Sequence, residues 1–277
     1  MNRYFGLVYS INDPAGKGIA DYIREYYKLE KSTECLSAGE CYEGKDFILV
    51  GFMDEPIYFD YLDDRLPSRV TEYIVLSRHS SAKKVKSYTV HHTGNFGDDA
   101  PYGGKPRSLA VANPIVSHKL LLNLKKLSIE YGVNNEYEVS YEATHHGPTE
   151  NKKPLCFIEI GSTLDEWRIP RNHEIVGLAV IKFLENPVHE CRVVTGIGGR
   201  HYPWKHTKYA IENNYCYGHI MAKYALPYLS ELTLNMMINN SVPRPEAIVV
   251  EKKGTRREHR ELIEKYAEKE GIIVEYI

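Results

Sequence analysis

Short runs of β-branched and aromatic residues alternate along this chain with longer amphipathic stretches, and this alternation constrains the fold more than any other feature. Such runs are typical of strands, whereas apolar residues spaced three and four apart are typical of helices. Strands separated by helices predict an α/β fold, a three-layer sandwich around a mostly parallel sheet. We expect strands at Arg3–Ser10, Asp46–Phe52, Tyr73–His79, Ser87–His92, Tyr137–His146, Leu155–Ser162, Cys191–Gly196, Ala247–Glu251 and Ile272–Ile277.

The amphipathic stretches have the end signals of helices. Asn113 and Pro114 precede one stretch and Gly132 follows it, which is the usual order of cap, first-turn proline and terminating glycine. The last stretch opens with the capping-box pair Thr255 and Glu258 and runs to Glu270. Together with this last stretch, we expect helices at Gly16–Leu29, Pro114–Tyr131, His173–Leu184 and Tyr217–Leu234. The helix Tyr217–Leu234 should have a break at Pro227.

Two pairs of predicted strands are joined by too few residues for a helical crossover. One pair is Tyr73–His79 and Ser87–His92, and the other is Tyr137–His146 and Leu155–Ser162. Parallel neighbours need a long connection, so we expect these pairs to be antiparallel or to lie at a sheet edge. The sheet should therefore be mixed. The proline-rich segment Ser241–Pro245 leaves too little chain for a second domain, so we expect a single domain over residues 1–277.

Composition and charge narrow the class of protein. The net charge of −2 over 277 residues offers no broad attraction for nucleic acid, so any RNA contact should be local. No apolar run is long enough to span a bilayer and no signal peptide is evident, so we expect a cytoplasmic protein. The five cysteines include no CxxC pair, and Cys156 and Cys191 lie in apolar runs that favour a place in the core.

Histidines, glycines and hydroxyl residues gather where the predicted strands end. In open α/β sheets, ligands bind outside the carboxyl ends of the strands, so a site rich in imidazole and carboxylate groups is expected there. Because side chains alternate along a strand, only one histidine of each His-His pair should face a given pocket, unless the loop turns first. The segments are Arg78–His79, His91–Asn95, His145–Thr149, Glu159–Thr163 and Gly198–Pro203.

Three roles are open for these histidines. Imidazole and carboxylate groups could hold zinc with one open position, which would activate a water for hydrolysis. One imidazole could instead act as a general base without a metal. The histidines could also simply cap turns, and no zinc motif of fixed spacing such as HExxH is present.

Two further groups of residues flank this site in the sequence. The turn that includes Ser10 and Asp13 could bind a phosphate or carboxylate at the start of a helix. It could also be an ordinary helix cap. It lacks the spacing of a phosphate-binding P-loop. Basic residues precede and follow the His91–His92 strand, where a polyanionic substrate would enter. They are Lys83, Lys84, Lys86, Lys105 and Arg107.

The segments Tyr88–Asn95, Glu142–Pro148 and Glu159–Thr163 resemble those of the archaeal and plant type of D-aminoacyl-tRNA deacylase, as do Ser10–Gly16 and Gly198–Tyr202. The resemblance spans nearly the whole chain. It implies hydrolysis of the ester between a D-amino acid, such as D-tyrosine, and tRNA. It also implies a monomeric, zinc-associated protein with a phosphorylase/hydrolase-like fold similar to peptidyl-tRNA hydrolase. No residue roles are carried over with it.

Residue roles follow from the chemistry that the reaction needs. An aminoacyl ester is already activated, so a positioned nucleophile and oxyanion donors suffice. We expect His92, His146 or His201 to hold zinc or activate water, with Glu142 or Glu159 as partner. The wider set of candidate metal ligands is His91, His92, His145, His146 and Glu159.

The substrate contacts are expected around that centre. Backbone N–H groups in Gly94–Asn95 or Gly198–Gly199 would stabilise the oxyanion, and the five basic residues would hold acceptor-stem phosphates. The pocket would refuse an L side chain by shape. The alternatives are a zinc aminopeptidase- or amidohydrolase-like enzyme acting on small molecules, and a tRNA-end binding protein without catalysis.

Overall fold

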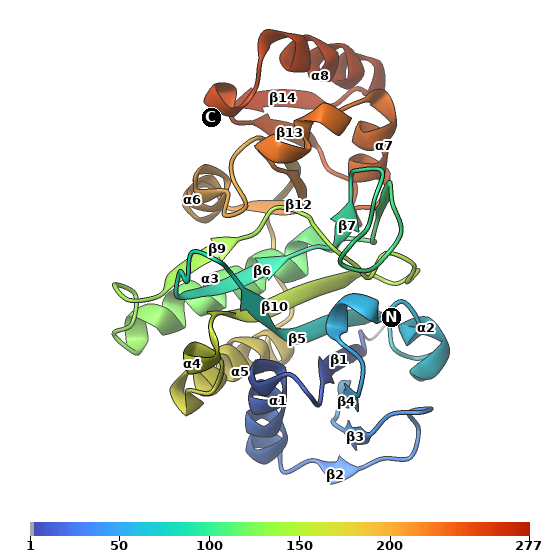
Figure 1. The fold of residues 1–277 in the computed structure, drawn as a ribbon, viewed down its shortest axis with the longest axis vertical. Coiled ribbons are helices and arrows are strands. Elements are labelled where there is room, and N and C mark those ends of the chain that lie inside the picture. The colour runs from blue at the N-terminus through green and yellow to red at the C-terminus, as the bar shows by residue number, and fades with distance from the viewer. Residues whose placement is uncertain (1–2) are drawn as a thin grey trace.

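A computed structural model describes residues 3–277 and shows two sheets that share one α/β body (Figure 1). The strands are β1 Phe5–Ser10, β2 Glu30–Lys31, β3 Glu40–Glu43, β4 Phe47–Phe52, β5 Glu72–Ser80, β6 Ser87–His91, β7 Gly94–Asn95, β8 Ser108–Leu109, β9 Glu138–Tyr141, β10 Leu155–Ser162, β11 Arg192–Ile197, β12 Tyr215–Met221, β13 Ala247–Val250 and β14 Ile273–Tyr276. The α-helices are α1 Pro14–Tyr27, α2 Leu62–Arg65, α3 Pro114–Glu130, α4 Leu164–Trp167, α5 Pro170–Glu185, α6 Trp204–Asn213, α7 Glu231–Asn239 and α8 Arg257–Glu270, with 3-10 turns at Pro56–Tyr58, Lys223–Tyr228 and Lys252–Gly254.

The larger sheet has eight strands in the order β2-β3-β4-β1-β5-β10-β6-β9. Strands β1, β4, β5 and β10 run parallel, β6 is antiparallel to β10, and β9 is parallel to β6. The predicted mixed, mostly parallel sheet is therefore confirmed. The two short-linked pairs do run antiparallel, but neither pair is adjacent. Strand β10 lies between β5 and β6, and β6 lies between β10 and β9.

Helices α1, α3 and α5 cover one face of this sheet, and α1 and α3 both pack on α5. Residues such as Leu76, Ile158 and Val90 point to these helices and belong to the main apolar core. The same core includes Tyr217 and Val249 of the second sheet, so the hydrophobic interior is continuous between the sheets. No helix in residues 3–277 is long and apolar enough to cross a membrane.

The second sheet was not anticipated from the sequence. Its four strands are parallel, in the order β12-β11-β13-β14, and helices α7 and α8 lie beside it (Figure 1). The predicted helix Tyr217–Leu234 is wrong, because Tyr215–Met221 forms strand β12 and only Glu231–Asn239 is α-helical in that region. Strand β12 is buried on both faces, and such a strand has no alternation by which to tell it from a buried helix.

Other boundaries also differ from the expectations. Strand β9 ends at Tyr141, so the segment that carries the His145–His146 pair is a loop. The cap of α8 is Arg256 with His259, and not the pair Thr255 and Glu258.

Cys156 is buried and unpaired, as expected for a core residue. Cys191 instead pairs with Cys216, and Cys35 pairs with Cys41. The Cα–Cα separations of 5.8 and 6.1 Å lie in the normal range for disulfides.

The first helix begins where Asp13 caps it. The Asp13 carboxylate accepts hydrogen bonds from the backbone N–H groups of Ala15 (2.9 Å) and Arg78 (2.8 Å). The second of these contacts joins α1 to the end of β5. Burial, opposed by the Arg78 guanidinium, raises the pKa of Asp13 to about 6.

Asp13→Ala should lower the free energy of unfolding by about 1–3 kcal/mol, because both N–H groups would lose their acceptor. Chemical denaturation of the two proteins measures this difference. Asp13→Asn keeps an oxygen acceptor for Ala15 and should lose less. Equal stability of Asp13→Ala and the parent protein would show that the cap contributes nothing.

Candidate active site

Five histidines and two glutamates meet on the face of the large sheet that is turned away from α1, α3 and α5. Pairing of β5, β10 and β6 sets Glu159 opposite Ser77 and Thr89, His79 opposite Gly161, and His91 opposite Phe157. Side chains in register share one face of a sheet, so a polar patch forms here. Its charged and imidazole members are His79, His91, Glu142, His145, His146, Glu159 and His201.

This placement corrects the expectation of a site at one edge of the sheet. Because β6 and β9 run opposite to β5 and β10, their carboxyl ends do not share an edge. An open pocket of about 530 Å³ lies over the patch. Its walls include Arg78, Tyr102 and Phe157, and its lining includes four of the histidines, His79, His145, His146 and His201.

The loop after β9 brings three members of the cluster into place. Its backbone is hydrogen-bonded to the part of the molecule that contains the small sheet. Ala143 N–H donates to His201 O in the loop after β11, and Thr144 N–H donates to Ile220 O in β12, both at 2.8 Å. His146 then takes a positive φ of 46°, and Gly147 packs so closely that an added Cβ would lie 2.3 Å from the Gly104 nitrogen. The loop therefore turns before alternation can separate the pair, and both His145 and His146 join the cluster.

Glu142 is the centre of the ionic contacts. Its fully buried carboxylate lies 3.0 Å from His79 Nδ1, 2.9 Å from His201 Nε2 and 3.6 Å from His145 Nε2. Burial alone would raise the pKa of Glu142, but the surrounding imidazoles, His79 foremost, outweigh it and hold the pKa well below its ordinary value. Glu142 is therefore a carboxylate at neutral pH.

A second carboxylate, Glu159, links two of the histidines. Its Oε2 lies 3.6 Å from His79 Nδ1 and 3.5 Å from His91 Nε2. Burial by itself lowers the pKa of His79, but the charges of Glu142 and Glu159 overcome it and raise that pKa to about 11. His79 is thus an imidazolium at neutral pH. The same balance, set mainly by Glu159, raises the pKa of His91.

Three histidines have Nδ1 beside a backbone carbonyl, which leaves Nε2 as the nitrogen available to a ligand. Nδ1 of His145 lies 2.8 Å from Ala143 O, Nδ1 of His146 lies 2.6 Å from Gly147 O, and Nδ1 of His91 lies 3.3 Å from His92 O. A carbonyl beside Nδ1 favours the tautomer whose Nε2 has a free lone pair, which is the arrangement of metal-binding histidines. Burial lowers the pKa of His146 to about 4 and that of His145 well below its ordinary value, so both are neutral.

The donor atoms of this cluster are close together and short of partners. One ligand atom each from His91, His145 and His146 lies within 4.8 Å of the other two, and the same holds for His91, Glu142 and Glu159. His79 Nε2, His91 Nε2, both Glu142 oxygens and Glu159 Oε2 are buried without a well-directed hydrogen bond. Buried polar atoms normally find partners, so this donor set fits a bound cation or a reacting molecule.

His92 does not belong to the cluster, although it was a candidate for both catalysis and metal binding. It points to the opposite face of the sheet, where its two ring nitrogens lie 3.0 Å from Leu155 O and 3.0 Å from Ser117 Oγ. Burial, aided by the nearby His219, lowers its pKa to about 3. The expected split of a His-His pair thus occurs at His91 and His92, and His91 is the member that joins the cluster beneath the pocket.

His79 is the member that the sequence reasoning left without a role. In the sequence, it stood out only as a polar residue at the end of the predicted strand Tyr73–His79. What brings it to Glu142 is the insertion of β10 between β5 and β6, and a single sequence carries no signal for that pairing.

Two expected binding turns have other partners. Ser10 and Asp13 are buried, and Asp13 caps α1, so no phosphate group can reach them from solvent. Gly94 N–H donates to His146 O and Gly198 N–H donates to Met221 O, each at 2.8 Å. These two amides are therefore occupied, and they cannot serve as the oxyanion donors that were expected in Gly94–Asn95 or Gly198–Gly199. The neighbouring Gly199, in the loop before His201, has a φ of 86°.

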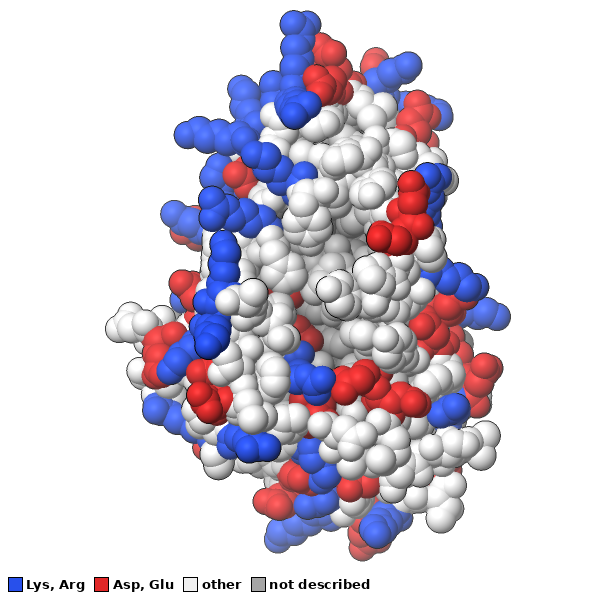
Figure 2. All heavy atoms as spheres, in the orientation of Figure 1, with Lys and Arg blue, Asp and Glu red and all other residues white. Residues whose placement is uncertain are grey.

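The expected basic residues differ in how free they are. Lys86 pairs with Glu136, Lys105 with Glu150 and Arg107 with Asp98, so their charges are locally balanced. Lys83 and Lys84 are exposed after the end of β5. Figure 2 shows further Lys and Arg side chains along one side of the half that contains the small sheet, and an uncharged hollow where the two halves meet. Exposed basic residues of that half include Arg200, Lys205, Lys223, Lys252, Lys253, Arg256 and Arg257.

Comparisons with known proteins agree over nearly the full length. A family model described as D-aminoacyl-tRNA deacylase matches residues 66–275. The D-aminoacyl-tRNA deacylase of Staphylothermus marinus is 68% identical over 273 residues, which is 99% of each chain, and that of Pyrococcus furiosus is 39% identical over 94% of this chain and 95% of its own. A solved structure described as a conserved protein of unknown function, AF0625, superposes with a TM-score of 0.90 at 30% identity, covering 100% of this chain and 96% of that one.

His92→Ala should lower the free energy of unfolding by about 2–5 kcal/mol, since it removes two buried hydrogen bonds and leaves a cavity. His146→Ala is the matched control, because that ring lies at the pocket and packs less tightly. Denaturation curves of both variants decide the point. If His92→Ala is no less stable than His146→Ala, the assignment of His92 to the core is wrong.

Proposed function

The chain belongs to the D-aminoacyl-tRNA deacylase family, and we propose that the histidine–carboxylate cluster is where it hydrolyses the ester between a D-amino acid and tRNA. The products are the free D-amino acid and tRNA. The observation that carries this proposal is the convergence of seven ionisable side chains, several without hydrogen-bond partners, under one open pocket. No feature of the pocket favours a small-molecule amidohydrolase or a binding protein without catalysis.

Zinc is the metal that suits this donor set. His91, His145 and His146 would hold it through Nε2, and Glu142 or Glu159 lies beside that set. Three imidazole ligands with an open position are typical of catalytic zinc, which polarises a carbonyl and makes a bound water more acidic. Four of the five residues expected as ligands from the sequence are in the cluster, and His92 is excluded by its place on the other face.

Glu142 and His201 are placed to act together as the general base. Glu142 is charged at neutral pH, so it stabilises the imidazolium that forms when His201 accepts the proton of the water that attacks the ester carbonyl carbon. His201, with Nε2 2.9 Å from Glu142 and its side chain 32% exposed, reaches the pocket from the other half of the molecule. It can pass that proton to the ribose oxygen as the ester C–O bond breaks.

The imidazolium of His79 can stabilise the transition state. Attack of water on the ester places negative charge on the carbonyl oxygen, and a fixed cation in a buried site is an effective partner for that charge. His79 is held in the charged form by Glu142 and Glu159. His79 would therefore stabilise the oxyanion, the role that was expected of backbone N–H groups in Gly94–Asn95 or Gly198–Gly199.

The pocket and its rim would also select the substrate. Its apolar wall, formed by Ile57, Tyr102 and Phe157, would receive the amino acid side chain, and its shape would distinguish the D from the L form. Exposed Lys83 and Lys84, at the end of the strand that carries His79, would contact phosphates of the acceptor end.

Deacylation of D-tyrosyl-tRNA tests the proposed function, with L-tyrosyl-tRNA beside it. We expect release of D-tyrosine only, and a fall of kcat by about 10²–10⁴ in Glu142→Gln, because His201 loses its charged partner while the shape of the site is kept. Glu136→Gln, at an exposed carboxylate, is the matched control and should leave kcat unchanged. Absence of D-tyrosine release would refute the deacylase assignment, and equal release from both substrates would refute selection by the pocket.

Exhaustive chelation should abolish deacylation, and added zinc should restore it, because the ion would be held in the site by the neutral Nε2 atoms. His145→Ala should weaken this restoration, since it removes one ligand. Measured rates before chelation, after it and after zinc addition give the answer. Full activity in metal-free protein would assign the chemistry to Glu142, His79 and His201 alone.

A further inference from the structure

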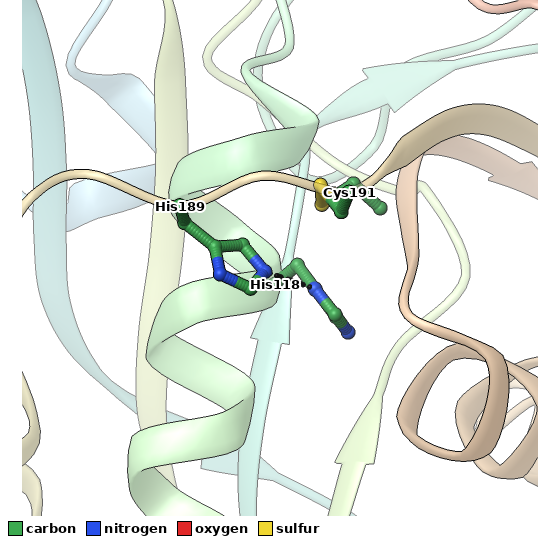
Figure 3. A group of neighbouring side chains, drawn as sticks. His118, His189 and Cys191 are labelled. Atoms are coloured by element: carbon green, nitrogen blue, oxygen red, sulfur yellow. Dashed lines mark hydrogen bonds between the residues drawn. A yellow bond between two sulfur atoms is a disulfide. The ribbon is translucent and has the colours of Figure 1, made fainter.

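A second group of metal-binding side chains lies outside the active site, where α3, the segment before β11, and β12 meet (Figure 3). His118 is on α3, His189 and Cys191 precede β11, and Cys216 is in β12. One donor atom from each of the four lies within 4.8 Å of the other three. The group shares no residue with the active-site cluster.

The histidines face each other beside the sulfur atoms. His118 Nδ1 lies 2.8 Å from His189 Nε2, and Figure 3 shows both rings turned to one another near Cys191. His118 is fully buried, and its Nε2 has no well-directed hydrogen bond in the described structure. A disulfide does not require imidazole neighbours, so the bond between Cys191 and Cys216 leaves this pair of histidines unexplained.

The other disulfide gives an internal comparison. Cys35 and Cys41 have nearly the same Cα–Cα separation, 6.1 Å against 5.8 Å, and belong to no group of three or more potential ligands among the described residues. Cysteine pairing in this chain therefore does not in itself gather histidines. The arrangement at Cys191 and Cys216 is specific to that place.

The group of four is accessible from one side. His189 and Cys191 are only half-buried, so an ion can enter from their side.

We propose that Cys191, Cys216, His118 and His189 form a zinc site when the two cysteines are reduced. A set of two thiolates and two imidazoles is a common structural zinc site with tetrahedral geometry. A dithiol or phosphine reductant supplies two electrons, the S–S bond takes up two protons to give two thiols, and zinc then displaces those two protons. The disulfide and zinc forms exclude each other, because both use the same sulfur atoms.

The position of the site suggests what the ion does. It would tie α3, which packs under the large sheet, to β12 and to the segment leading into β11 of the small sheet. The residue next to His118, Ser117, is the one that holds His92. Zinc would thus fasten the two sheets together under reducing conditions, as the disulfide links β12 to that segment under oxidising ones.

Cobalt(II) binding to the full chain tests this proposal without reference to activity. The active-site cluster contains no sulfur, so a thiolate-to-cobalt absorption band reports the second site alone, whereas d–d bands also arise from cobalt at the active site. We expect the thiolate band in phosphine-reduced protein, its loss in the Cys191→Ser/Cys216→Ser variant, and its retention in the matched Cys35→Ser/Cys41→Ser variant. Zinc should displace the cobalt and remove the band.

Absence of a thiolate band in fully reduced parent protein would overturn the proposal, and so would a thiolate band that persists without Cys191 and Cys216. His189→Ala serves if the double variant fails to fold, because this half-buried ring can be removed at less cost to the core. That variant should bind cobalt at least about tenfold more weakly. Unchanged cobalt affinity and spectrum in His189→Ala would also overturn the four-ligand site.

Discussion

The buried carboxylate of Glu142 and its imidazole partners hold the candidate site together. One partner, His79, comes from β5 of the large sheet, and the other, His201, comes from the loop after β11 of the small sheet. A buried charge is stable only when it is paired, so these contacts couple the position of the two sheets to the state of the site. They also fix the charge pattern that the chemistry needs, a carboxylate beside an imidazolium.

The two faces of the large sheet have different roles, one in the hydrophobic core and the other in the candidate site. The face under α1, α3 and α5 is apolar and includes buried His92, whose nitrogens are occupied by Leu155 and Ser117. The other face carries the cluster and the pocket. Antiparallel insertion of β6 and β9 beside β10 is what permits this, because it brings residues from the middle and the ends of strands to one place.

Much of the fold could be read from local pattern, and the site only in part. Strands such as Leu155–Ser162 and helix Pro114–Glu130 follow from apolar runs and end signals. Strand β12 was missed because it is buried on both faces. Alternation predicted that His91 and His92 point apart, but not which one joins the cluster, since that depends on where the helices pack. The turn at His146 and the contact of His79 with Glu142 depend on long-range pairing, which local sequence does not encode.

An anomalous difference map at the zinc absorption edge, from crystals of the zinc-loaded protein, tests the central claim most directly. The account predicts a peak on the polar face of the large sheet, bonded to Nε2 of His91, His145 and His146, with Glu142 beside it and His92 remote. A peak bonded to His92, or no peak at this cluster in protein whose activity depends on zinc, would contradict it.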